Sequence, residues 1–172
     1  MNATDYQAES EDSANQLLAI ARETMAKVKN CWFVTVTRSG ETNARIVAPI
    51  PGVPGGDEWT VWVLTSSGSR KIDEIRRNDR VTLGYQHDPE SAYVALAGRA
   101  IIINERAEIS ERWNKSWDNV FRAGAEDADA VFVKIEVDRI ELFSLARKVT
   151  PAPFCKRSAA LARNVEGNWR VA

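Results

Sequence analysis

Histidine is nearly absent from this sequence, because His87 is the one histidine in the chain. A zinc centre built on several histidines is therefore excluded, and a Ser–His–Asp catalytic triad is disfavoured. Cysteine is scarce too: Cys31 and Cys155 lie far apart and form no CxxC pair. We expect both to be free thiols in a reducing compartment, and we expect no metal site.

Long apolar runs and an excess of one charge are also missing. No apolar stretch approaches membrane-spanning length, and the polar, acidic start of the chain is unlike a signal or transit peptide. The 23 Lys and Arg residues nearly balance the 24 Asp and Glu residues, so no overall field favours nucleic acid or an anionic membrane. We therefore expect a cytoplasmic protein with neither partner, in which any anion site is local.

What the sequence does contain is a run of strand patterns between a few helical ones, within 172 residues. The patterns predict helices over about 12–29, 66–78 and 105–121, strands over 31–37, 44–50, 58–65, 81–86 and 92–103, one bent strand or two over 130–146, and one or two helical turns within 155–164. Strands outnumber helices, and several are linked as hairpins. We predict a single mainly β domain over 1–172, a mostly antiparallel barrel with flanking helices, whose core covers about 15–145.

The most informative segment is Thr65-Ser-Ser-Gly-Ser-Arg-Lys71, which joins a strand to a helix. Small residues with a glycine let backbone N–H groups converge, and the helix N-terminus adds partial positive charge. Arg70 and Lys71 would share a bound phosphate there. The alternative is that both are solvated charges offset by Asp73 and Glu74.

Arg45 is the second candidate. On an extended strand it shares one face with Asn43 and Val47, opposite the face of Ala44 and Ile46. Its charge needs a partner, because burying it unpaired is costly. That partner is either a carboxylate of the chain or a ligand group, such as a phosphate or a flavin carbonyl.

Several stretches, in order, resemble one family. The stretch Gly40-Glu-Thr-Asn-Ala-Arg-Ile-Val47 is similar to Gly-x-Pro-His-x-Arg-Pro-Met of the pyridoxamine 5'-phosphate oxidase-like, FMN-binding split barrel proteins. Ser69-Arg-Lys71, Asn78-Asp-Arg-Val-Thr-Leu83 and Tyr93-Val-Ala-Leu-Ala-Gly-Arg-Ala100 resemble its later motifs, and Trp113 resembles the tryptophan of its general stress group. The resemblance covers roughly residues 15–145 and implies a split β-barrel that binds FMN in a homodimer, with the flavin site at the subunit interface.

The resemblance also implies roles for single residues. Arg45 and Val47 would contact the flavin and its phosphoribityl chain, and Leu64 and Thr65 would lie against the ring edge and the ribityl chain. The phosphate would be held by Ser69, Arg70 and Lys71.

Two further residues are implied by position alone. Tyr93 stands where the oxidases carry a flavin-contacting glutamine. Trp113 would approach the flavin across the dimer interface, although its place on an apolar helix face equally predicts a core residue.

Departures from the family pattern bear on the activity. Asn43 replaces the usual histidine, and Ile46-Val47 replace Pro-Met. Trp169-Arg170 is only faintly similar to the family's C-terminal substrate signature, which disfavours a true pyridoxamine phosphate oxidase. The leading hypothesis is a stress-related FMN-dependent oxidoreductase acting on a small molecule. The alternatives are a non-catalytic flavin-binding sensor or carrier and, less favoured, a deazaflavin or haem protein.

Overall fold

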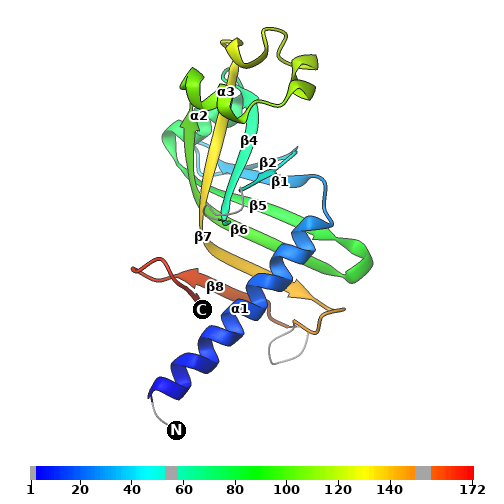
Figure 1. Cartoon of the computed structure of the whole chain (residues 1–172), viewed down its shortest axis with the longest axis vertical. Coiled ribbons are helices and arrows are strands. Elements are labelled where there is room, and N and C mark those ends of the chain that lie inside the picture. The colour runs from blue at the N-terminus through cyan, green and yellow to red at the C-terminus, as the bar shows by residue number, and fades with distance from the viewer. Residues whose placement is uncertain (1–2, 53–57, 150–155) are drawn as a thin grey trace. The chain divides into compact units, whose positions relative to one another are not determined.

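The computed structural model describes residues 3–52, 58–149 and 156–172, which form mainly β-strands (Figure 1). The strands are β1 Cys31–Val36, β2 Thr42–Val47, β3 Ile50–Pro51, β4 Thr60–Ser66, β5 Arg80–His87, β6 Ala92–Ile103, β7 Ala130–Ser144, β8 Ala159–Arg163 and β9 Trp169–Val171. The helices are α1 Ala3–Ala26, α2 Arg70–Arg77 and α3 Arg106–Arg112, with short 3-10 helices at η1 Asp88–Glu90, η2 Lys115–Asn119 and η3 Gly124–Glu126. Cys155, predicted to be a free thiol, lies outside the described residues.

The strands form one sheet in the order β2-β1-β5-β6-β7-β4-β3, and β8 pairs with both β7 and β9. The pairs β3–β4, β4–β7, β7–β8 and β8–β9 are antiparallel. Two predicted hairpins are confirmed, since β1 neighbours β2 and β5 neighbours β6. The expectation of a mainly antiparallel β fold with flanking helices is therefore confirmed.

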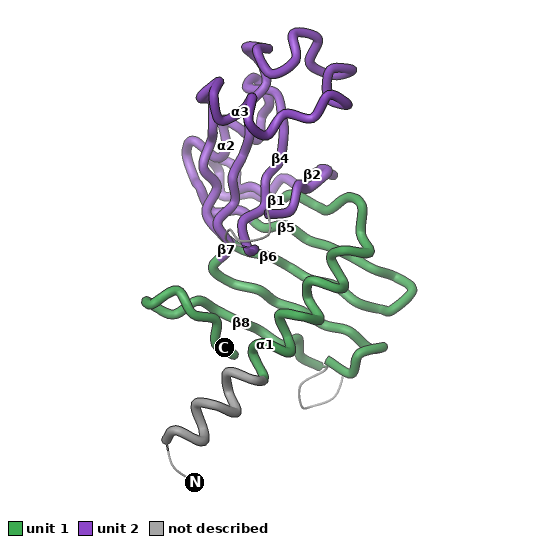
Figure 2. Tube along the Cα trace, in the orientation of Figure 1, with its two compact units in different colours: residues 1–33, 82–97, 138–172 green, residues 34–81, 98–137 purple. Residues whose placement is uncertain are grey.

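Figure 2 divides the chain into two compact units. Unit 1 consists of Met1–Phe33, Thr82–Ala97 and Asp138–Ala172, and unit 2 consists of Val34–Val81 and Gly98–Val137. The boundaries fall within or beside strands. The prediction of a single domain stays a prediction.

Unit 2 has its own apolar cluster. β4 pairs with the first half of β7, from Thr60 opposite Glu136 to Ser66 opposite Ala130. Trp62 of β4, Phe132 of β7 and Ile109 of α3 are all buried and pack together, with the rings of Trp62 and Phe132 edge to face at 6.0 Å. This cluster holds α3 against the strands, since it buries the apolar side of a short helix.

Two local features fix the backbone of unit 2. Gly98 of β6 lies so close to β7 that a Cβ added to it would sit 2.3 Å from the carbonyl oxygen of Glu136. Arg106 donates to the main-chain oxygens of Ala125 at 3.2 Å, Asp127 at 2.6 Å and Ala130 at 2.7 Å. The guanidinium thereby donates hydrogen bonds to loop carbonyl oxygens that have no neighbouring strand to pair with.

Unit 1 combines α1 with the C-terminal strands. Ala14, Leu18 and Ala21 recur at helical spacing and are buried, and α1 packs against β9. Leu161 of β8, fully buried, pairs with Ile140 of β7. The first helix was predicted over 12–29, whereas it runs from Ala3 to Ala26.

The helix predicted over 105–121 is wrong in its second half. α3 ends at Arg112, and the next residue, Trp113, has extended backbone at φ −65° and ψ 135°. The Asn114 side chain then accepts a hydrogen bond from the Ser116 N–H at 2.9 Å and starts η2 as a new turn. A side chain that caps locally competes with helix continuation, which explains the interruption.

The helical turns predicted within 155–164 are also wrong, because the described part of that segment contains β8. Ala159 and Leu161 are buried while Ala160 and Ala162 are half-buried. This is a period of two, and it fits a strand. The run of alanines favours a helix locally, but pairing with β7 and β9 overrides that propensity.

Candidate functional site

The predicted anion site lies in unit 2, where β4 ends and α2 begins. Ser69 is the residue before the helix, with extended backbone at φ −74° and ψ 145°, and its hydroxyl makes no capping hydrogen bond. The N–H groups of the first helical turn therefore lack the side-chain acceptor that a capping residue supplies, and the Ile72 N–H donates to the Ser69 carbonyl at 2.9 Å instead. The start of α2 accordingly keeps donors available for an anion.

Three side chains gather at this point. Lys71 donates to the Thr65 hydroxyl at 2.6 Å, and the Thr65 and Ser69 hydroxyl oxygens are 3.5 Å apart. Burial and the nearby positive charge of Arg45 hold the pKa of Lys71 below its usual value. Arg70 is exposed and makes no hydrogen bond or ion pair with another described residue. The structure thus brings Thr65, Ser69 and Lys71 together, and Arg70 lies between Ser69 and Lys71 in the chain with its side chain exposed.

The small-residue turn before α2 has a partner that the sequence did not reveal. The hydroxyls of Ser66 and Ser67 donate to the Asp129 carboxylate at 2.9 and 2.8 Å, and the Gly68 N–H reaches it at 3.4 Å. Hydrogen bonds from the two serines hold the pKa of Asp129 below its ordinary value. The donors of residues 66–68 converge as predicted, but they bind the Asp129 carboxylate. The candidate anion site is therefore limited to residues 69–71 and Thr65.

Arg45 is bound to a buried carboxylate of the chain itself. Its guanidinium lies 2.9 Å from Glu74 Oε2 and also donates to the Thr35 hydroxyl, which in turn donates to Glu74. Asn43 donates to the other oxygen of Glu74 at 2.5 Å. The Arg45 side chain is 21% exposed and that of Glu74 only 8%, so this is a largely desolvated ion pair.

Glu74 carries a negative charge despite its burial. Burial opposes its ionisation, but the hydrogen bonds from Thr35, Asn43 and Arg45 outweigh that and lower its pKa. Sequence reasoning paired Glu74 with Arg70 and Lys71 on the surface. The buried Ile72 and Ile75 on either side of it in α2 are the signal that places Glu74 on the inward face.

Val47, Leu64 and Trp113 divide between two environments. Val47 is half-buried, on the same face of β2 as Arg45. Leu64 and Trp113 both pack against the apolar cluster of Trp62, Ile109 and Phe132. Successive residues of β4 face opposite sides, so Leu64 points away from the side of Thr65.

Trp113 is firmly held where it lies. Its indole N–H donates to Asp118 at 2.8 Å, and its ring meets those of Trp117 and Phe121 edge to face at 5.5 and 6.1 Å. These contacts favour the core interpretation of Trp113, which the sequence had left open beside the flavin contact.

Tyr93, the last predicted residue, belongs to unit 1. Its hydroxyl donates to Glu141 at 3.2 Å, and its ring stacks on Phe143 with a centroid distance of 6.1 Å. Tyr93 therefore belongs to a different unit from the residues at the start of α2.

No group of three or more His, Cys, Asp or Glu side chains that could hold a metal ion occurs in the described part of the chain. Among the described helices, none is both long and apolar enough to cross a membrane.

The model of the family "pyridoxamine 5'-phosphate oxidase like" matches residues 18–152, well over half of the sequence. The chain belongs to this family. No curated protein matches it.

Solved structures agree on the fold. The protein related to general stress protein 26 from Clostridium acetobutylicum is 17% identical, with a TM-score of 0.67 over 76% of this chain and 90% of that one. A pyridoxamine 5'-phosphate oxidase-related, FMN binding protein from Nostoc punctiforme is 11% identical, with a TM-score of 0.63 over 91% and 94%. PhzG from Burkholderia lata, in complex with tetrahydrophenazine-1-carboxylic acid, is 17% identical, with a TM-score of 0.63 over 95% and 91%. At these identities the likeness establishes the fold, and the predicted split barrel is confirmed.

Proposed function

We propose that this member of the pyridoxamine 5'-phosphate oxidase-like family binds FMN, with the phosphate held at the start of α2. The observation that carries the proposal is the set of donors there. Ser69 makes no capping hydrogen bond, the exposed Arg70 has no partner among the described residues, and the partly desolvated Lys71 lies beside Thr65. A phosphate dianion fits this set, since it matches two cations and several hydroxyl and N–H donors at once. Asp129 keeps the neighbouring turn negative, which limits the anion to this one position.

Bound FMN would take electrons from one small molecule and pass them to another. In this proposal the residues at the start of α2 only bind the phosphate and take no part in the redox chemistry. Arg45 and Val47, on the half-buried face of β2, line the flavin, and Glu74 holds the Arg45 guanidinium in a fixed orientation. Leu64 and Tyr93 remain proposed flavin contacts by family resemblance, and Trp113 remains one that would act from a second subunit.

We also propose a homodimer that completes the site. β2 ends the strand order of the sheet, and its outer face carries the exposed Ala44 and an Ile46 that is 63% exposed. An exposed isoleucine on an edge strand suits an isologous contact with a second copy. A cytoplasmic location is part of the same proposal, and the buried free thiol of Cys31 is compatible with it.

The proposed activity is that of an oxidoreductase acting on a small molecule, with a role in stress. A flavin-binding sensor or carrier is the second candidate. It is favoured by the pairing of Arg45 with Glu74, because that pairing leaves little net positive charge beside the flavin. A turnover assay with NADH or NADPH and an electron acceptor separates the two: an oxidoreductase turns over repeatedly, whereas a carrier holds a flavin that is not cycled.

The experiment that tests FMN binding is calorimetry with FMN and with riboflavin, which lacks the phosphate. Charge-assisted hydrogen bonds contribute about 1.5–3 kcal/mol each, so FMN should bind at least about tenfold more tightly. Lys71→Ala should remove much of that advantage, and Arg122→Ala, which alters an exposed arginine, should leave it intact. Equal affinity for the two flavins in the parent protein would reject the phosphate site.

A further inference from the structure

The turn at residues 66–68 of unit 2 holds a carboxylate from a distant part of the chain. One oxygen of Asp129 accepts hydrogen bonds from the hydroxyls of Ser66 and Ser67 at 2.9 and 2.8 Å. The Gly68 N–H reaches the same oxygen at 3.4 Å, and the Ser67 N–H donates to the Asp129 main-chain oxygen at 2.7 Å. The side chain and the main chain of Asp129 are therefore both fixed to this turn.

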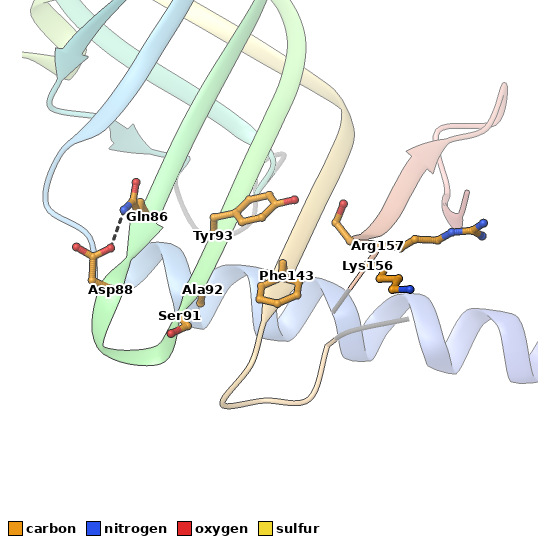
Figure 3. Close-up of a pocket in the computed structure, with 9 residues that line it drawn as sticks. Gln86, Asp88, Ser91, Ala92, Tyr93, Phe143, Lys156 and Arg157 are labelled. Atoms are coloured by element: carbon orange, nitrogen blue, oxygen red, sulfur yellow. Dashed lines mark hydrogen bonds between the residues drawn. The ribbon is translucent and has the colours of Figure 1, made fainter. Parts of the chain in front are cut away.

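This arrangement is that of an anion-binding turn whose anion is part of the protein. Successive small residues that aim hydroxyl and N–H donors at one point form a concave site for a negative group. Hydrogen bonds from Ser66 and Ser67 hold the pKa of Asp129 below its ordinary value, so its carboxylate is charged at neutral pH. Asp88, which borders a cavity in unit 1, accepts a hydrogen bond from the Gln86 side chain at 2.6 Å (Figure 3). Three donors on one oxygen distinguish Asp129 from a surface carboxylate of that kind.

A second set of donors adjoins the first and holds no carboxylate. The Ser69 N–H donates to the Ser66 main-chain oxygen at 3.1 Å, so the two sets belong to one continuous turn. Lys71 donates to the Thr65 hydroxyl at 2.6 Å and forms no ion pair with a carboxylate of the described residues. A ligand with two linked phosphates would extend from this second set toward residues 66–68, where it would meet the charge of Asp129.

We propose that Asp129 determines the specificity of the anion site at α2: it restricts the site to a single phosphate group and excludes a ligand with two linked phosphates. The donors that a second phosphate needs are occupied, and the group that occupies them is itself negative. Like charges placed together and donors already in use both disfavour the wrong ligand. The proposal rests on the proposed phosphate site, and it adds the class of ligand that the site takes, a phosphate monoester over a diphosphate.

The probes are inorganic phosphate and inorganic diphosphate, each titrated against protein loaded with FMN while flavin fluorescence reports displacement. In the parent, diphosphate should displace FMN no better than phosphate does, despite its larger charge. Asp129→Ala frees three donors and removes the charge, so diphosphate should bind about tenfold or more tightly than to the parent. Phosphate should change by less than about threefold, because a charge at an exposed position is screened by salt.

A second variant separates the charge from the occupied donors. Asp129→Asn keeps an acceptor oxygen for the serine hydroxyls and removes the charge, so it should give a smaller gain in the same direction. If the alanine variant weakens both anions alike, the turn has lost its order, and the asparagine variant then decides. Glu111→Ala, which removes an exposed carboxylate of α3, is the control and should leave the ratio of the two affinities unchanged.

Two results would overturn the proposal. One is a ratio of diphosphate to phosphate affinity that neither Asp129 variant raises, and the other is a parent protein that prefers diphosphate by about tenfold. If FMN still binds more tightly than riboflavin in these proteins, only the role of Asp129 is rejected. If FMN and riboflavin bind equally, or neither anion displaces FMN, the phosphate site itself is rejected and its specificity with it.

Discussion

At the scale of single residues, Glu74 determines how much positive charge the α2 region presents. It is buried and accepts hydrogen bonds from Thr35, Asn43 and Arg45. Removing one partner of a buried ion pair leaves the other charge buried without a counter-charge, and this lowers the stability of the folded protein. Glu74 therefore affects two properties: the stability of unit 2 and the net charge near the proposed ligand site.

Glu74→Gln should lower the free energy of unfolding by about 1–2 kcal/mol at neutral pH, because Arg45 loses its counter-charge. The folded pKa of Glu74 lies below its ordinary 4.5, so its stabilising contribution is complete above that value and is lost as the pH falls through the folded pKa. Urea titrations from neutral pH to below 4.5 should show the difference between parent and variant shrinking. Glu111→Gln, at an exposed position in α3, is the control and should change little. A difference that stayed constant with pH would assign the effect to packing.

The same pair should tune a bound flavin in opposite directions. In protein saturated with FMN, Arg45→Ala should lower the reduction potential, and Glu74→Gln should raise it, because a cation near the ring favours the anionic reduced form. Shifts of about 20–60 mV correspond to the 1–3 kcal/mol expected for a charge in a partly dry site. Redox titrations of the parent and both variants measure these potentials. If neither variant shifts the potential, Arg45 does not lie near the flavin ring.

The site could be predicted from sequence only where its parts are local. Thr65, Ser69, Arg70 and Lys71 lie within seven positions, and the strand–turn–helix pattern is enough to bring them together. Asp129 reaches the turn from about 60 positions away, and no local pattern signals that contact. The partner of Arg45 was left open for the same reason.

At the scale of elements, the close approach of β6 to β7 depends on Gly98. A Cβ there would lie 2.3 Å from the Glu136 carbonyl oxygen and 3.0 Å from the Val137 Cα, both of them backbone atoms that cannot swing away. Only glycine fits this crossing without moving a strand.

Gly98→Ala should therefore destabilise the protein by about 1–3 kcal/mol, the usual cost of overpacking. Gly84→Ala is the control, because its new Cβ would meet the nearest side-chain atom, Trp32 Cβ, at an ordinary 3.7 Å. That variant should be close to neutral, since alanine restricts the unfolded chain more than glycine does. Thermal unfolding measures the stability of both variants. Equal stability would mean that the β7 backbone shifts at Glu136 and Val137 with little cost.

Strands were predicted well where hydrophobic residues alternate, and β6 was predicted with its observed ends, 92–103. The predictions failed where tertiary pairing decides, as in β8, or where one side chain caps a turn, as Asn114 does before η2. In both places the local sequence favours a helix, and a contact that the pattern does not contain prevents it.

At the scale of the whole molecule, the proposed dimer provides the clearest test. Ile46→Asp places a charge on the exposed face of β2 and should raise the dimer dissociation constant about tenfold or more, because an unpaired carboxylate would be buried at the contact. FMN affinity should fall with it if the site is shared between subunits. Light scattering across a range of concentrations measures the dimer dissociation constant of the parent and of the variant.

Val165→Asp is the matched control, since Val165 is fully exposed in the turn between β8 and β9. It should leave assembly and FMN binding unchanged. A parent protein that is monomeric at every concentration and still binds FMN tightly would contradict the shared site.

The Arg106 side chain has a consequence for how this sequence can change over time. Its guanidinium bonds to main-chain oxygens at Asn104, Ala125, Asp127 and Ala130, and a main-chain oxygen is present whatever residue stands there. Mutations at the exposed Glu126 and Ala128 can therefore accumulate without loosening the path of the loop. Gly124, at φ +63°, and Asp127, whose carboxylate accepts hydrogen bonds from the Ala123 and Asp129 N–H groups, are more constrained. Asp129 is different, because its own carboxylate holds the turn before α2. Among relatives we expect positions 126 and 128 to vary while the arginine at 106 and the aspartate at 129 stay fixed.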